Sequence, residues 1–358
     1  MLKTSDFDFN LPSNLIAQKP FFPKEETKML ICNQDGISDA QVMNLAGFLQ
    51  KGDVLVFNNA RVIKAKLSAT IQRNSAHLDF NLDQNLNCDK SNENAIWNAL
   101  CKPAKKVQTG DHLQIAPDFF ATVLNKSDDG FITIEFDSCG NALLEKFEKY
   151  GEVPLPPYIK RSDETTAELT KDDRTNYQTI YASGGTAVAA PTAGLHINEK
   201  IMASLEERGI QKAFVTLNVG AGTFLPVRSD HIQDHKMHSE FFTISQESAD
   251  IINAAKKAGN RVVAVGTTSL RVLESSCDDN GIMQATQTNT KIFIYPPYKF
   301  KITDILMTNF HLPKSTLFML ICAFIGKEGA FKVYNHAIDN KYRFYSYGDS
   351  SLLFKNDV

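Results

Sequence analysis

The sequence lacks the features that mark several classes of protein. Its six cysteines include no C-x-x-C pair and no short spacing that could close a zinc site, so we expect reduced thiols and no metal. The longest apolar run, Leu317 to Ile325, falls well short of the ~20 residues of a membrane-spanning helix. The opening "MLKTSDFDFNLP" is acidic where a signal peptide would be apolar. We therefore expect a cytoplasmic protein.

An excess of charge of one sign is also missing. The chain has 38 Lys and Arg against 41 Asp and Glu, which gives a net charge of −3. A polyanion such as RNA would therefore have to be held by a local basic patch. With 43% hydrophobic and 22% charged residues the composition is that of a globular protein, and 358 residues exceed the usual size of one core.

The hydrophobic period changes twice along the chain and predicts an inserted domain. A helix over residues 39–50 and a strand in "GDVLVFNN" begin an α/β layer. From about Ala65 to Phe136, short alternating segments are typical of a small antiparallel barrel. Helices and strands alternate again after the connector "YGEVPLPPYIKR". We predict an open α/β sheet with helices on both faces, formed by residues 1–65 and 151–358, that carries a β-barrel at residues 66–150.

The second half supplies most of the predicted sheet. Its predicted strands are "AVAA", "AFVTLNV", "RVVAVG" and "KIFIY". Its predicted helices cover residues 198–208, 247–258 and 317–325, with another from about Thr268. Ligands of open α/β sheets bind beyond the carboxyl ends of the strands, where "APTAGLH", "GAGTF" and "GTTSLR" stand. We expect these three segments to converge on one crevice.

Two of these segments could hold an anion or a ligand backbone. In "GTTSLR", the helix start at Thr267, Thr268 and Ser269 suits an anion, with Arg271 one turn on; plain N-capping with a surface arginine is the alternative. In "VGAGTF", the glycines would let the backbone approach a ligand closely, or would simply form a turn. Leu225 stands where the dinucleotide-binding fingerprint needs its third glycine.

The densest group of titratable side chains follows in "HIQDHKMHSE". It holds His231, His235, Lys236, His238 and Glu240 within ten positions. The histidine spacing could ligate zinc on a helix, but the run is very polar and has other acidic residues close by. Acid–base or hydrogen-bonding work is the favoured interpretation.

Two further clusters lie near the C-terminus. "LMTNFHLPKST" places Asn309 and His311 before Lys314, with Ser315 as a cap for the apolar helix; the histidine could be structural or could serve an anion. "YRFYSYGDSSLLF" interleaves aromatic residues with Arg343, which suits base stacking or equally a half-buried edge strand.

Several strings together resemble one enzyme family. "SDFDFNLPSNLIAQKP", "GDVLVFNNARVIKAKL", "YGEVPLPPYI", "APTAGLH", "VGAGTFLPVRSDHIQDHKMHSE", "VGTTSLRVLES", "TNFHLPKSTLFML" and "YRFYSYGDSSLL" are similar to motifs of the S-adenosylmethionine:tRNA ribosyltransferase-isomerases of queuosine biosynthesis, in the family's order and over nearly the full length. The resemblance implies transfer and isomerisation of the ribosyl group of S-adenosylmethionine onto 7-aminomethyl-7-deazaguanine in a tRNA anticodon. The products would be epoxyqueuosine, adenine and methionine, with S-adenosylmethionine as co-substrate and no metal or redox cofactor.

Such chemistry needs two or three acid–base groups of intermediate pKa in one pocket. We infer from residue type that the catalytic groups are His235, His238 and Glu240. The candidates for binding the small substrate are Gly220, Gly222, Thr223, Lys236, Thr267, Thr268, Ser269, Arg271, His196, Asn309 and His311. The candidates for binding tRNA are Arg61, Lys64, Lys102, Lys105, Lys106, Lys314, Arg343, Tyr345 and Tyr347. We expect a monomer.

The chain departs from the family pattern at two places. It has "LNVGAGTF" for "LHVGAGTF" and "FNNAR" for "FNDTR", so Asn218, Asn59 and Ala60 cannot act as acid or base, although amides can keep the hydrogen bonds. Two rival functions stay open. One is a non-catalytic tRNA-binding module that uses the barrel and basic clusters such as Lys160 and Arg161; the other is a conventional methyltransferase or dehydrogenase on a Rossmann sheet.

Overall fold

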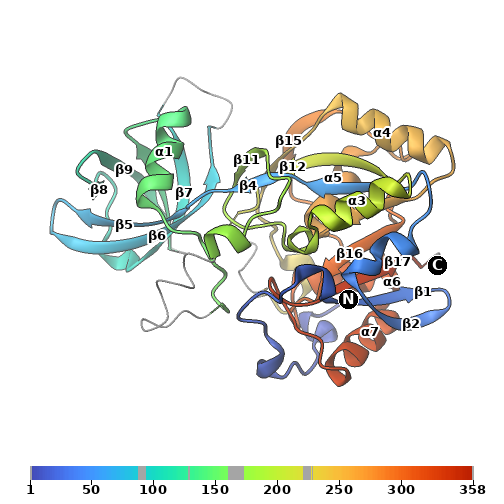
Figure 1. Cartoon of the computed structure of the whole chain (residues 1–358). Helices are drawn as coiled ribbons and strands as arrows, with labels where there is room; N and C mark the ends of the chain where they lie inside the picture. The colour runs from blue at the N-terminus through green and yellow to red at the C-terminus, as the bar shows by residue number, and fades with distance from the viewer. Residues whose placement is uncertain are drawn as a thin grey trace.

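The computed structural model describes residues 2–87, 94–127, 130–159, 173–220, 227 and 229–356. These residues form a mixed nine-stranded sheet covered by helices and, beside it, a closed barrel of six antiparallel strands (Figure 1). The predicted fold class is therefore confirmed. No helix within the described ranges is both long enough and apolar enough to cross a membrane.

The large sheet has a parallel centre and mixed margins. In the order β15-β13-β12-β3-β14-β16-β17-β1-β2, the strands β12, β3, β14 and β16 run parallel to one another. Their bounds are Gln211–Leu217 (β12), Val54–Asn58 (β3), Val262–Val265 (β14) and Ile305–Asn309 (β16). The margins are Thr286–Thr290 (β15), Glu240–Ile244 (β13), Ser350–Phe354 (β17), Lys28–Asn33 (β1) and Gly36–Gln41 (β2).

Strand β3 is buried on both faces and divides the core into two layers. Val54 and Val56 belong to the larger hydrophobic cluster, whereas Leu55 and Phe57 belong to the cluster on the opposite face. Because successive side chains of a strand alternate between its faces, a central strand covered on both sides needs such a continuous apolar run.

Helices cover both faces of the sheet, as predicted. The larger cluster includes residues of Gln246–Lys257 (α4), Thr267–Ser276 (α5), Thr316–Ile325 (α6) and Lys327–Asp339 (α7). The opposite cluster includes residues of Glu199–Glu207 (α3) and of the 3₁₀ helix Val42–Phe48 (η4). The predicted helix over residues 39–50 is thus a shorter 3₁₀ helix that follows β2. Leu45 and Ala46 lie three and four residues after Val42, a spacing that fits either kind of helix.

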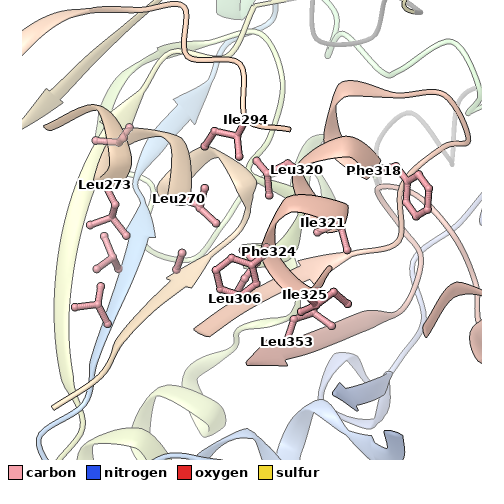
Figure 2. Close-up of a cluster of buried hydrophobic side chains, with 14 of the residues drawn as sticks. Leu270, Leu273, Ile294, Leu306, Phe318, Leu320, Ile321, Phe324, Ile325 and Leu353 are labelled. Carbon is pink, nitrogen blue, oxygen red and sulfur yellow. The ribbon is translucent and has the colours of Figure 1, made fainter. Parts of the chain in front are cut away.

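Side chains from three elements interlock in the larger cluster. Leu270 and Leu273 of α5, Leu306 of β16 and Phe324 of α6 are all buried there (Figure 2). Burying a side chain of this size contributes about 1.5–3 kcal/mol. The apolar helix α6 begins at the predicted cap, where Ser315 Oγ accepts a hydrogen bond from the backbone N–H of Phe318 at 3.1 Å. This packing holds α5 rigidly against the sheet, which matters for the site described below.

The barrel forms a second, separate core, as predicted from the alternating segments. Its strands are Lys66–Ile71 (β5), Ala76–Asn85 (β6), Ile96–Lys102 (β7), His112–Ala116 (β8), Phe119–Lys126 (β9) and Phe131–Phe136 (β10). Its interior includes Phe80 and Trp97, and the helix Gly140–Tyr150 (α1) adds Phe147 to the same cluster. The chain leaves the large sheet through Ala60–Val62 (β4) and returns as Gly184–Ala187 (β11), and these two short strands pair in parallel.

The short 3₁₀ helices lie in the connections. They are Thr4–Phe7 (η1), Ser13–Leu15 (η2), Lys24–Glu26 (η3), Ala104–Lys106 (η5), Thr192–His196 (η7) and Ile232–Asp234 (η9).

Two predicted strands are wrong. "AVAA" is not a strand of the large sheet: β11 ends at Ala187, and Val188 makes a single backbone hydrogen bond to Val219 O at 2.9 Å. "KIFIY" is also not a strand, because the polar segment β15 just before it takes the place beside β13. Ile294 of "KIFIY" nevertheless packs into the larger cluster (Figure 2). The apolar residues of "KIFIY" therefore indicated that this segment is partly buried, but not that it pairs as a strand.

Candidate active site

The carboxyl ends of the four parallel strands meet at one edge of the sheet. Asn58 fastens two of these ends together, because its Nδ2 donates to Leu217 O at 3.1 Å and its Oδ1 accepts from Leu217 N at 3.0 Å. Asn58 is fully buried, so the amide replaces the water that these backbone groups would otherwise need. The segments that follow β12 and β3 are thereby held in place. Nothing in the sequence pattern singled out this residue.

A cleft opens where this edge meets the barrel. Its walls are Asp83, Gln84, Asn218, Gly220, His238, Ser239 and Glu240. We call it the barrel-facing cleft. It brings together three of the predicted site residues, namely Gly220, His238 and Glu240. Asp83 and Gln84 come from the barrel strand β6 and were not predicted.

A buried ion pair stands behind the cleft. Arg271 Nη1 in α5 donates to Glu240 Oε2 at the start of β13, and the two side chains are only 7% and 5% exposed. The other oxygen of Glu240 accepts from the backbone N–H of Gly220 at 3.4 Å. Arg271 Nε and Nη2 are buried without a hydrogen-bond partner in the described part of the chain. Buried donors without partners cost free energy, so an oxygen ligand placed there would be bound favourably.

The histidine-rich segment distributes its side chains differently. His238 is exposed at the cleft, and its ring lies 6.2 Å from that of Phe131 in the barrel strand β10. His235 packs edge-on against Phe293 at 5.5 Å, and burial, aided by His238, lowers its pKa below the usual value. Lys236 is exposed. Gly222 and Thr223 lie outside the described residues.

The N-terminus of α5 is less open than the hydroxyl-rich motif indicates. Ser269 Oγ donates to Val265 O at 2.9 Å, so this hydroxyl serves the helix. Thr267 is buried, and Thr268 Oγ1 is buried without a hydrogen-bond partner among the described residues. Gly266 just before them has a φ of 91°, which a residue with a side chain rarely adopts.

A second polar group lies at the same edge, at the end of β16. Thr192 Oγ1 donates to Asn309 Oδ1 at 2.8 Å, and Asn309 Nδ2 lies 3.1 Å from His196 Nε2. Because an amide nitrogen can only donate, His196 Nε2 must accept, and the ring is neutral. Burial, together with the charges of Arg343 and Lys24, lowers the pKa of His196 to about 3.

His311 belongs near this second group. Its Nε2 is 3.2 Å from Thr308 Oγ1, and burial lowers its pKa to about 3. The second group lies at the end of β16, whereas the barrel-facing cleft lies beside β12. Strands β3 and β14 stand between these two, so the two groups are three strand spacings apart, roughly 14 Å. The structure thus brings the predicted segments to one edge of the sheet but not into a single cleft.

Asn218 and Asn59, the two asparagines at which the chain departs from the family pattern, make structural hydrogen bonds. Asn218 Oδ1 accepts from the backbone N–H of Thr186 at 2.9 Å and so holds β11 against the sheet. Asn59 Oδ1 accepts from Thr216 Oγ1 at 2.6 Å, and its Nδ2 donates to Ser183 Oγ at 3.1 Å. Both amides therefore fix the strands through which the chain leaves and re-enters the sheet.

The predicted tRNA-binding cations fall into two classes. Lys64, Lys314 and Arg343 are engaged in ion pairs with Glu148, Asp8 and Asp349, respectively. Arg61, Lys102, Lys105 and Lys106 are exposed, and no ion pair of theirs is found within the described ranges. The second class is the better placed to meet phosphates.

The predicted aromatic contacts are not on the surface. Tyr345 is 8% exposed and its ring stands 4.1 Å from that of Tyr158, whereas Tyr347 is 3% exposed and donates to Asp173 at 2.8 Å. The string that contains them ends in β17, which lies inside the sheet and not at its edge. Among the described residues, the exposed phenylalanine rings are instead Phe21 (42%) and Phe22 (59%).

The first of these phenylalanines, Phe21, borders a second pocket. The Arg343 guanidinium lies 5.2 Å from the centre of the Phe21 ring, and Lys24 Nζ lies 6.0 Å from that of Phe22. The second pocket is lined by Pro20, Phe21, Lys24, Thr27, Asn176, Leu195, His196, Arg343, Ser346 and Tyr347. Cations and aromatic faces therefore share one surface next to the buried His196. In the part of the chain that is described, no three His, Cys, Asp or Glu side chains are placed to hold a metal ion.

Comparisons with known proteins agree with the motifs. The family model described as "Queuosine biosynthesis protein" matches residues 4–353. A Rhodospirillum rubrum protein named S-adenosylmethionine:tRNA ribosyltransferase-isomerase is 46% identical over 347 residues, which cover 97% of this chain and 96% of that protein. A Rickettsia bellii protein of the same name is 46% identical over 363 residues, which cover 99% of each chain.

The fold is also found in a solved structure. The crystal structure of an S-adenosylmethionine tRNA ribosyltransferase from Thermotoga maritima matches with a TM-score of 0.53 at 30% identity, covering 98% of this chain and all of that chain. The motifs, the family model and the relatives all point the same way, and the chain therefore belongs to the queuosine biosynthesis protein family and is an enzyme of the transferase class.

Proposed function

We propose that this enzyme transfers the ribosyl group of S-adenosylmethionine to 7-aminomethyl-7-deazaguanine at the wobble position of a tRNA and isomerises it. The products are epoxyqueuosine, adenine and methionine. The names of the relatives support the reaction class. The observation that carries the proposal is the barrel-facing cleft, where His238, Glu240 and the backbone of Gly220 meet at the carboxyl edge of the sheet. The reaction takes place in the cytoplasm and uses no metal or redox cofactor.

The histidines of the cleft region would transfer protons in this reaction. A sulfonium acidifies the hydrogens on the adjacent carbon, so a base must remove one of them, and the attacking amine must also lose a proton. Adenine leaves more readily if a donor protonates or hydrogen-bonds its ring. His238 lines the cleft and can exchange protons there. His235, whose pKa is lowered, stays neutral at neutral pH and can accept a proton.

Glu240 has a different role in this proposal. Its two oxygens accept from Arg271 and from the backbone of Gly220, so it orients the glycine segment against the substrate. The unpartnered Nε and Nη2 of Arg271 bind the carboxylate of the methionine part of the substrate, which would satisfy both donors. Lys236 adds an exposed cation on the same segment.

The tRNA is held by cations and by exposed rings. Lys102 is the last residue of β7, at the end of the strand away from the cleft, and Lys105 and Lys106 lie in η5 just after it. These lysines would bind phosphates of the anticodon arm. Phe21 and Phe22 stack on unpaired bases of the loop, with Arg343 and Lys24 beside them. Because the chain has a net charge of −3, it has no general attraction for RNA, and its affinity for tRNA must come from such local contacts.

Product analysis tests the proposal. The purified enzyme is incubated with S-adenosylmethionine and tRNA that carries the aminomethyl base, and nucleosides and small molecules are analysed by mass spectrometry. We expect free adenine and methionine in equal amounts with epoxyqueuosine. S-adenosylhomocysteine would instead indicate a methyltransferase, and tRNA binding without any turnover would indicate a binding module.

A further inference from the structure

The imidazole of His196 has a tautomer that its neighbours fix. Asn309 Nδ2 lies 3.1 Å from His196 Nε2 and also donates to the backbone oxygen of Asp349 at 3.4 Å. Since a backbone oxygen can only accept, this second contact identifies the amide nitrogen of Asn309, and His196 Nε2 is the acceptor. A neutral imidazole carries one proton, which must then lie on Nδ1. His196 therefore has an N–H donor at Nδ1.

This donor of His196 points to the second pocket and has no partner there. The side chain is 6% exposed and lines the pocket, and no hydrogen bond of Nδ1 is found among the described residues. Nδ1 is also not one of the polar atoms that the protein encloses completely without a partner, so it reaches the pocket. A buried donor without a partner costs free energy, so an oxygen atom placed in the pocket would be bound favourably.

Lys24 brings a positive charge to the same pocket. Its side chain is half-buried and forms no ion pair with a carboxylate in the described part of the chain. Burial lowers the pKa of Lys24, and the charge of Glu199 acts in the other direction. The pKa of His196 responds to the positive charge, because Arg343 and Lys24 lower it further after burial. An anion bound here would stabilise the ammonium form of Lys24.

The other charged groups at the second pocket are engaged within the protein. Arg343 Nε and Nη2 donate to Asp349 Oδ1 at 3.2 and 2.9 Å, and Asp349 is 3% exposed. Asp173 accepts from the hydroxyl of Tyr347 at 2.8 Å. The paired guanidinium of Arg343 also lies 5.2 Å from the centre of the exposed Phe21 ring. The pocket thus combines an ammonium, a neutral N–H donor and an aromatic ring.

This combination matches a phosphate that is joined to an unpaired base. A phosphodiester carries one negative charge, and its free oxygens only accept hydrogen bonds, so it suits the donors of Lys24 and His196. Unpaired bases stack on aromatic side chains, and the Phe21 ring is available at the same pocket. The pocket is roughly 14 Å from the barrel-facing cleft, or about four nucleotides of a stacked strand that advances 3.4 Å per nucleotide.

We propose that the second pocket binds one phosphate group of the anticodon loop, with Lys24 as its counter-charge and His196 Nδ1 as a directed donor, while Phe21 stacks on an adjoining base. The proposal rests on the proposed function, because the tRNA substrate supplies the phosphate. The pocket would hold the loop at a second point, a few nucleotides from the base that is modified. Inorganic phosphate shares the same chemistry, and the test separates the two.

The test removes one phosphate charge at a time from the RNA. Anticodon stem-loops with guanine at the wobble position are prepared so that a neutral methylphosphonate replaces a single phosphate of the loop, at each linkage in turn. Their affinities for the parent enzyme and for Lys24→Met are measured by fluorescence anisotropy without S-adenosylmethionine. Inorganic phosphate is then added to the complex with the unsubstituted stem-loop, at constant ionic strength.

One linkage should stand out in the parent enzyme, with a loss of affinity of about tenfold when its charge is removed. Lys24→Met should weaken binding of the unsubstituted stem-loop, lower its salt slope by about one unit, and be insensitive to that linkage. His196→Leu should reduce the same penalty. His196→Gln should keep most of it, because its amide can accept from Asn309 and still donate to the phosphate.

Lys28→Met is the matched control. Lys28 is exposed, donates to the backbone oxygen of Asn340 at 3.0 Å and does not line the pocket. This variant should keep the penalty at the same linkage. Thermal unfolding of every variant accompanies the binding data, and the Lys24 comparison does not depend on whether His196→Leu folds.

The proposal is overturned if no linkage stands out, or if the penalty persists unchanged in Lys24→Met. It is also overturned if inorganic phosphate binds in a Lys24-dependent way while no linkage of the RNA is sensitive, since the pocket then takes the free anion. Because these measurements need no turnover, they fail separately from the product analysis. Epoxyqueuosine formation without a Lys24-dependent linkage would contradict only the phosphate site, and such a linkage without turnover would contradict only the proposed reaction.

Discussion

Glu240, the first residue of β13, and Arg271, in the second turn of α5, join the sheet and its helix layer through an ion pair that is almost completely buried. Only one of the three guanidinium nitrogens of Arg271 is used in this pair; the other two are buried without partners in the described residues. Such an arrangement is costly in an empty site and favourable when a ligand oxygen is present.

Arg271→Ala should therefore weaken binding of S-adenosylmethionine at least several-fold, as measured by calorimetry. It should also lower the free energy of unfolding, because Glu240 is left buried without its counter-charge. Arg261→Ala is the control: Arg261 pairs with Asp53 at the opposite end of β14 and β3. Comparable stability loss without loss of affinity is expected there. Normal affinity in Arg271→Ala would show that the substrate lies elsewhere.

Removal of metal ions should leave the turnover unchanged. The histidines of the "HIQDHKMHSE" segment point to different surroundings: His235 packs on Phe293, whereas His238 faces the barrel. Dialysis against a strong chelator, followed by an assay for adenine release, checks this. The prediction is contradicted if the purified enzyme contains stoichiometric zinc and loses activity when the zinc is removed.

The double variant Lys105→Ala with Lys106→Ala should weaken tRNA binding and reduce the dependence of its affinity on salt. Each phosphate contact contributes about one unit to the slope of log K against log salt, so the slope should fall by roughly one to two units. Binding of S-adenosylmethionine should not change. Lys257→Ala with Lys332→Ala, on α4 and α7, provides a control for a general change in charge. A parental slope would place the tRNA on another surface.

Replacing Phe21 and Phe22 by alanine should lower the affinity for the anticodon stem-loop. Stacking on an aromatic side chain contributes roughly 1 to 3 kcal/mol per base. Unlike the lysine variant, this one should keep the salt dependence of the parent. Met43→Ala, which removes another exposed apolar side chain, should have no effect on binding. Equal affinity of the phenylalanine variant and the parent would rule out the second pocket as a loop contact.

The stability of the enzyme should fall in mildly acidic solution. His196 is buried with a pKa of about 3, whereas in the unfolded chain its pKa is about 6.5. Between these values the unfolded chain binds a proton that the folded protein does not, so the free energy of unfolding decreases as pH falls below about 6.5, by up to about 1.4 kcal/mol per pH unit. In His196→Gln, which keeps an acceptor for Asn309, this part of the slope should disappear. Urea unfolding between pH 7 and 5 measures it, with the exposed His77→Gln as control. An identical slope in the His196 variant would contradict the assignment.

The sequence predicted the fold best where one physical signal dominated. The helices capped by Asn198, Ser245 and Ser315 appear where expected, because a capping side chain and an apolar stripe are local features. The predictions of strands at "AVAA" and "KIFIY" are wrong because strand pairing depends on which segment lies beside an edge strand of the sheet, and not on apolar alternation alone. The polar segment β15 takes the position beside β13.

The sequence names candidate groups for the site but does not show how they assemble. His238, Glu240 and Gly220 stand in one motif, and the structure places all three around one cleft, while their roles in the reaction stay predictions. Asp83 could not be found, since its position depends on a bulge that only the pairing of β6 with β7 reveals. Tyr345 and Tyr347 were candidates for base stacking because they are interleaved with Arg343, yet tertiary packing buries them.

The place of β1 in the sheet has a consequence for how the chain is made. Met29 of β1 pairs with Ser350 of β17, and in the described sheet β17 is the strand that joins the β1–β2 hairpin to the other strands. During synthesis, the hairpin emerges among the first segments, but its docking partner is translated almost the whole length of the chain later. The inserted barrel, whose strands are close in sequence, can close long before that moment. We therefore expect the ribosome-bound nascent chain to carry a folded barrel and an unfinished sheet whose exposed edge is a target for chaperones.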